Sequence, residues 1–164
     1  MASPFYAGDI EQPVALRSVW NATTTVAYGQ TMVFGTTTII DAASDYPLVW
    51  GREATLATNT EGGAFPAGLY WGLPPTNASH QWQTGTNLSA NQGGFVICRG
   101  VHVQAYIYGS VTYGDILYAS GASPGSLFAS NTYSASLTVV GRSLFTAAST
   151  TTHQQGIYVH LGAS

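Results

Sequence analysis

Carboxylates and histidines are the residues of this 164-residue chain whose chemistry suits catalysis or metal binding. Asp41 and Asp45 flank an Ala-Ala-Ser segment, and two such carboxylates can bind a metal ion or act on a glycosidic bond. Both roles usually need further acids or carbonyl groups nearby. A solvated loop is therefore the favoured interpretation, and the weaker alternative is a glycosidase-like or other β-fold enzyme that pairs Asp41 or Asp45 across a cleft.

The histidines lack the spacing of a metal site. No two of His80, His102, His153 and His160 lie two or four residues apart, which is the arrangement that brings two ligands to one metal ion on a strand or helix. We interpret them as outward-facing residues on strands, and we predict no metal ligand and no cofactor.

One short motif matches a familiar catalytic mechanism in its letters only. Gly121-Ala122-Ser123-Pro124-Gly125 fits the pattern Gly-x-Ser-x-Gly, but we interpret Ser123-Pro124-Gly125-Ser126 as a plain turn and not as a nucleophile turn. The chain has no phosphate-binding loop that ends in Gly-Lys and no dinucleotide fingerprint. It has no lysine at all, which excludes Schiff-base chemistry. We predict that the protein is not an enzyme.

Charge is scarce. Only 7% of the residues are charged and the formal net charge is −3, whereas ordinary domains have about 25% charged residues. Four dispersed arginines do not form the basic patch that binds nucleic acid or an anionic membrane. We expect no nucleic-acid and no membrane partner, and the sequence shows no signal-peptide pattern. A hydroxyl-rich surface is easily desolvated, which suits a protein that packs against neighbours.

The same short patterns occur twice along the chain, in the same order. All four arginines fall within or beside these matches, which predicts an internal duplication. The matched pairs are Arg17-Ser18-Val19 with Arg99-Gly100-Val101, Val26-Ala27-Tyr28-Gly29 with Val111-Thr112-Tyr113-Gly114, Gly51-Arg52 with Gly141-Arg142, and Gly68 to Leu73 with Gly156 to Leu161.

Both copies have the pattern of β-strands. From Val101 to Tyr108 apolar and polar residues alternate, which places His102 on the predicted outer face. No helical apolar period exceeds about two turns. The sequence predicts an all-β fold of internally duplicated small β-barrel or sandwich units packed into one compact body with little helix. The predicted parts are an N-terminal arm (1–13), copy one (14–73), a crossover segment (74–95) and copy two (96–164).

The segments outside the repeat contain the candidate binding residues. Phe5 and Tyr6 in the arm, and Trp82 in the crossover, are predicted contacts to another subunit or to a partner protein. Trp20 is a second possible surface tryptophan, while the repeat places Trp50 and Trp71 in the core. The arginines are predicted structural clamps that bind acids or strand-end carbonyls: Arg17, Arg52, Arg99 and Arg142.

Copy two resembles a known family of viral proteins. Its sequence Val111-Thr112-Tyr113-Gly114-Asp115-Ile116-Leu117-Tyr118, followed by Val139-Val140-Gly141-Arg142-Ser143-Leu144 and Gly156-Ile157-Tyr158-Val159-His160-Leu161, resembles the small β-barrel modules of tailed-bacteriophage capsid decoration (cement) proteins. The likeness covers about 60 residues, and copy one fits more loosely because Gln30 replaces the Asp.

The resemblance implies a non-enzymatic virion protein that binds the outer surface of the capsid and stabilises it. Its implied partners are the major capsid protein and itself, as a homotrimer or alternatively a dimer. The alternative of a different class is a carbohydrate-binding β module on a phage fibre or head, with a glycan bound beside Trp82 or Trp20.

Overall fold

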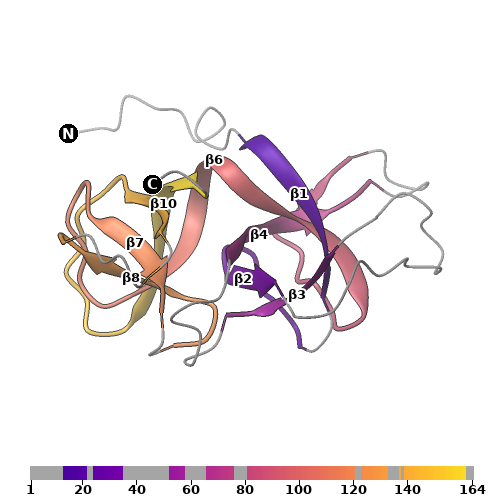
Figure 1. The fold of residues 1–164 in the computed structure, drawn as a ribbon, viewed down its shortest axis with the longest axis horizontal. Coiled ribbons are helices and arrows are strands. Elements are labelled where there is room, and N and C mark those ends of the chain that lie inside the picture. The colour runs from indigo at the N-terminus through magenta and orange to yellow at the C-terminus, as the bar shows by residue number, and fades with distance from the viewer. Residues whose placement is uncertain are drawn as a thin grey trace.

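The computed structural model describes residues 13–21, 24–34, 52–57, 66–75, 81–120, 123–132, 137 and 139–161. All regular secondary structure within these residues is β-strand, which confirms the predicted all-β class (Figure 1). The strands are β1 (Pro13–Asn21), β2 (Thr31–Phe34), β3 (Arg52–Leu56), β4 (Pro66–Leu73), β5 (Gln83–Thr84), β6 (Gln92–Tyr108), β7 (Ile116–Ala119), β8 (Leu127–Ser130), β9 (Val139–Ser143) and β10 (Thr152–His160).

Hydrogen-bonded strand pairs close into two five-stranded rings that share β6. The first barrel consists of β1, β3, β2, β4 and the beginning of β6, and β5 is added outside it on β4. The second barrel consists of the rest of β6 with β8, β7, β9 and β10. In Figure 1, β6 runs between β1–β4 on the right and β7, β8 and β10 on the left. It also runs through the predicted boundary between the crossover and copy two.

The two barrels have the same topology and nearly the same registers. In each, the first and third strands are parallel and the other neighbouring strands are antiparallel. Met32 pairs with Gly68 and Leu117 with Gly141, and each pair is followed by a register slip. A shared slip at the same place is a strong sign of common construction, because bulges are specific local features of a sheet. The duplication is therefore present in the fold.

Each barrel has its own buried core, and the two cores are built from equivalent positions. Burial of these apolar side chains supplies the main favourable free energy of folding. The first barrel buries residues that include Val19, Val26, Met32, Ala54, Ala67 and Val96, and the second buries their equivalents Ala105, Val111, Leu117, Leu127, Val140 and Ile157.

The structural equivalences differ from most of the sequence matches. The match around Tyr28 and Tyr113 is correct, but Gly141 is equivalent to Gly68 and not to Gly51. Arg17 occupies the position equivalent to His102, and not to Arg99. Short matches between strands are ambiguous because many strands share one alternating pattern, and only the pairing partners settle the register.

A bulge in β6 overturns one sequence prediction. His102 pairs with Ile157 while Ala105 pairs with Gln155, so β6 has one extra residue between these two points. The bulge breaks the strict alternation, and it turns the His102 side chain into the interior, where it is fully buried. The prediction that His102 faces outward is therefore wrong.

The two barrels are joined by a turn as well as by β6. The Tyr28–Gly29 turn of the first barrel lies on the bulge of β6, where Tyr106 N–H donates to the carbonyl of Gly29 at 3.2 Å. A Cβ on Gly29 would lie 1.9 Å from the carbonyl oxygen of Gln104, so only glycine fits. Nearby, the amide of Thr31 donates to the carbonyl of Gly125 at 2.7 Å.

Gly29 and Gly114 offer a matched pair for testing the contact between the Tyr28–Gly29 turn and the bulge of β6, which we call the joint between the barrels. Both have φ of 86°, but nothing lies within 4 Å of a Cβ on Gly114. We expect Gly114→Ala to lower the free energy of unfolding by about 1 kcal/mol through backbone strain alone. Gly29→Ala adds a clash with backbone and should cost at least about 2 kcal/mol more. Urea denaturation measures both, and equal losses would show that the turn does not pack on β6.

Candidate functional site

Two equivalent turns define the most informative surface of the protein. In the first barrel, Gln30 Oε1 accepts the amide of Ala27 at 2.7 Å. In the second, Asp115 Oδ2 accepts the amide of Thr112 at 2.8 Å. A side-chain acceptor placed after the glycine closes the turn in both copies.

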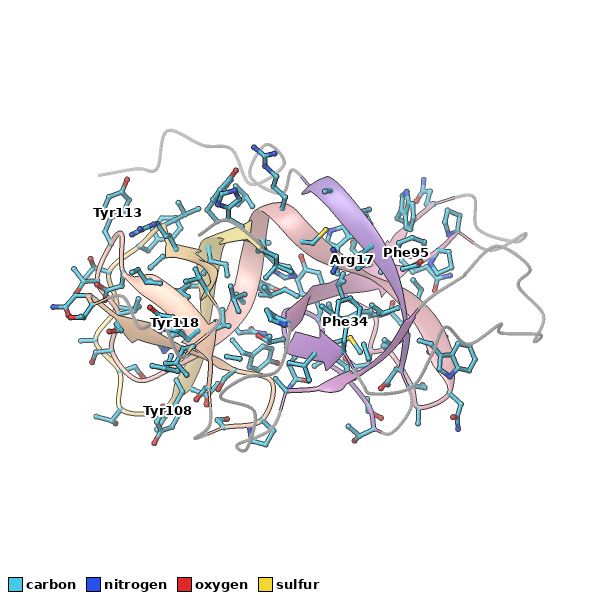
Figure 2. The ribbon with its side chains drawn as sticks, viewed as in Figure 1. Arg17, Phe34, Phe95, Tyr108, Tyr113 and Tyr118 are labelled. Atoms are coloured by element: carbon cyan, nitrogen blue, oxygen red, sulfur yellow. The ribbon has the colours of Figure 1, made fainter. Side chains whose placement is uncertain are left out.

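The environments of these two turns are opposite. Tyr28 is half-buried, and its ring lies 4.6 Å from that of His102. Tyr113, its equivalent, is 70% exposed, and it points away from the second barrel in Figure 2. The second barrel thus covers the Tyr28–Gly29 turn of the first barrel. The equivalent turn of the second barrel, which contains Tyr113, faces solvent.

The strands beside the exposed turn complete one continuous surface. Arg142 Nη1 donates to the carbonyl of Gly114 at 2.9 Å, and Arg142 pairs across the strands with Tyr158. The rings of Tyr158 and His160 lie 5.9 Å apart. We call this surface the terminal face and define it by Tyr113, Arg142, Phe145, Tyr158 and His160.

Phe145 joins the terminal face through a glycine. A Cβ on Gly156 would lie 2.8 Å from Cε2 of Phe145, so the ring sits directly over the backbone of β10 beside Tyr158. Next to it, Thr146 Oγ1 accepts the amide of Tyr113 at 3.0 Å. The ring is 45% exposed, which leaves an apolar surface facing solvent.

The terminal face is the diverged copy of a buried contact. Arg142 is equivalent to Leu69 and Tyr158 to Ile97, since the registers of the two barrels match at these pairs. Leu69 and Ile97 are fully buried in the core cluster that includes residues of the second barrel. Arg142 and Tyr158 are polar but as large as the apolar residues at the equivalent positions. Terminal units of repeat proteins also have polar residues on the face that inner units pack against a neighbour.

The chemistry of the terminal face suits binding to a protein. Tyr, Phe and Arg are enriched where protein interfaces are buried, and they contribute most of the binding free energy. Arg99 lies opposite His160 on the neighbouring strand and extends the positive charge of the face. The carboxylate of Asp115 is engaged with the backbone of its own turn. The face therefore favours an acidic or neutral surface with apolar side chains.

Trp82 forms a second exposed aromatic site, as the sequence predicted. Its ring is 43% exposed, and it packs on Phe95 at 4.9 Å and on Trp71 at 5.2 Å. Trp71 is buried, which confirms its predicted place in the core, but its Nε1 has no hydrogen-bond partner. The neighbours of Trp82 in sequence, Gln81 and Gln83, are exposed and half-buried, respectively.

The predicted arginine clamps are spread over the molecule. Arg17 is exposed on β1 and its guanidinium lies 5.1 Å from the centre of the Phe34 ring (Figure 2). Arg142 binds a turn carbonyl, as the clamp hypothesis expects. Arg99 is exposed, and the side chain of Arg52 lies outside the described part. The clamp role therefore stays a prediction.

Several other predicted residues also lie outside the described part of the chain. These are Phe5, Tyr6, Asp41, Asp45, Trp50 and His80.

Among the described residues, no group of three or more metal-ligating side chains comes together. The same part of the chain contains no helix that is long and apolar enough to cross a membrane. Sequence analysis missed Tyr113, Phe145 and Tyr158 as binding residues, although the duplication pointed to the turn that holds Tyr113.

Comparison with known proteins assigns the chain to no family. No protein-family model matches the chain, and no curated protein matches it in sequence.

Arg142→Ala distinguishes a structural clamp from a binding residue. Arg142 is exposed and makes one hydrogen bond to an exposed turn, and such contacts contribute about 1 kcal/mol or less. We expect the melting temperature to fall by no more than a few degrees. A large fall in differential scanning fluorimetry, with the folded state otherwise intact, would make Arg142 a clamp.

Proposed function

We propose that this protein is a non-enzymatic virion structural protein that binds the outer surface of a phage capsid and stabilises it. The observation that carries the proposal is the terminal face, which exposes tyrosine, phenylalanine and arginine where the first barrel buries its equivalent contact. The resemblance of copy two to decoration proteins supports the same function, because Tyr113 and Arg142 of this face lie within the stretches that carry the resemblance.

The composition supports the proposal from a second direction. With few ions to desolvate, a surface of hydroxyl and aromatic side chains can be buried at low cost against a shell. Decoration also repeats one contact many times over a symmetric particle, so weak individual contacts gain by avidity. A homo-oligomer, either a trimer or a dimer, is the expected unit because symmetric assemblies are the rule for such proteins.

Binding to undecorated heads of tailed phages tests the proposal. We expect saturable binding of the purified protein in a sedimentation assay. Tyr113→Ala should weaken it about 30-fold, which corresponds to the roughly 2 kcal/mol of an interface hot spot. Native mass spectrometry of the free protein gives the oligomeric state.

Tyr108→Ala is the matched control. Tyr108 is also exposed, at 39%, but it lies at the opposite end of the second barrel from Tyr113 in Figure 2. Its variant should bind heads like the unchanged protein. Absence of binding to every head preparation, or equal loss in both variants, would contradict the proposal.

Glycan binding at Trp82 is the second candidate function. A half-exposed tryptophan that packs on two other aromatic rings can stack on a sugar ring. This candidate predicts sugar-dependent quenching of tryptophan fluorescence that Trp82→Ala abolishes and Tyr113→Ala retains. A glycan array with no binding would remove it.

A further inference from the structure

His102 lies where the two barrels meet, and both of its ring nitrogens have partners. Nε2 is 3.0 Å from the carbonyl oxygen of Tyr70 in β4. The backbone amide of Gln104 in β6 donates to Nδ1 at 3.2 Å. The side chain therefore connects a strand of the first barrel to the bulge of the second, and it is fully buried.

These partners determine the protonation state of His102. Because the amide of Gln104 can only donate, Nδ1 must be the acceptor, and the single ring proton lies on Nε2 and is donated to Tyr70. The carbonyl of Tyr70 also accepts the amide of Gly29 at 2.9 Å. The carbonyl of Tyr70 thus accepts hydrogen bonds from both the His102 ring and the Tyr28–Gly29 turn beside it.

The surroundings of His102 oppose a positive charge. Burial lowers the pKa of His102 from its ordinary 6.5 to about 4, and the hydrogen bond to the carbonyl of Tyr70 offsets part of this effect. The elements packed against it contribute the ring of Tyr28 from the turn, the backbone of Tyr70 from β4, and Ile157 from β10. Tyr28 is the only titratable side chain among these, and within the described residues no carboxylate or guanidinium faces the ring.

We propose that His102 is an acid-sensitive latch that holds the Tyr28–Gly29 turn of the first barrel on the second barrel. A second proton on the ring would sit on Nδ1 and face the amide of Gln104, so two donors would oppose each other. The charged ring also requires water, and none fits between it and the ring of Tyr28, whose centre lies 4.6 Å away. Acid therefore opens the joint at this turn.

The direction of the pH effect follows from linkage. Above pH 6.5 His102 is neutral in both the folded and the open state, so the joint has its full stability. Between pH 6.5 and about 4 the open state binds a proton that the closed state excludes, and closure weakens steadily as pH falls. Below about pH 4 both states are protonated and no further weakening occurs. The equilibrium shifts toward the open state by on the order of 10²-fold in total.

Amide hydrogen exchange on the full-length protein tests the latch. We expect protection at Gly29, Gln104 and Tyr106 to fall between pH 7 and pH 4.5, after correction for intrinsic exchange rates. Protection at Leu117, in the core of the second barrel, should fall much less. His102→Asn, which cannot gain a proton, should show no such acid-dependent loss, whatever its stability at pH 7.

His160→Asn is the matched control, because His160 lies on the neighbouring strand and is partly exposed. It should open in acid like the unchanged protein. If His102→Asn does not fold, the nuclear magnetic resonance titration of the His102 ring decides the matter. A midpoint far below 6.5, with protection lost between pH 6.5 and that midpoint, supports the latch. A midpoint near 6.5, or the same acid opening in His102→Asn, would overturn it.

Discussion

The rest of the structure depends on one strand that serves two barrels. β6 closes the first five-stranded ring with its beginning and opens the second with its end. Sheet edges that would attract other strands are removed by closing each ring. Sharing β6 also fixes the barrels to each other, because neither ring can rotate without breaking hydrogen bonds in the other. This arrangement solves the problem of two units that would each bury too little apolar surface alone.

The bulge in β6 adds the second constraint. It lets His102 turn inward and creates the shape on which the Gly29 turn lies, where no side chain larger than glycine fits. The equivalent turn in the second barrel packs on no such surface among the described residues, and Tyr113 is exposed. This one-sided packing explains why Leu69 is apolar and buried while its equivalent, Arg142, is charged and exposed. Divergence of the copies thus marks which surface is internal and which is available to a partner.

The proposed function and the proposed latch use different surfaces of this arrangement. Tyr113 and Arg142 lie on the outside of the second barrel, whereas His102 is buried between the barrels. The terminal face therefore stays intact when the contact between the barrels loosens, as long as the second barrel keeps its core. The order of stability within the protein follows from this: local contacts at the turn open more readily than a closed ring of strands.

The sequence by itself determined the all-β class, the duplicated turns and the surface position of Trp82, because alternation, turn residues and composition act locally. It did not determine which strands are equivalent, since strands of similar pattern fit several registers. It placed His102 on the wrong face, because a bulge depends on the partner strand. Only the tertiary structure decided which of two nearly identical turns is covered, since burial depends on what lies opposite, and Tyr28 and Tyr113 have the same local sequence pattern but different neighbours.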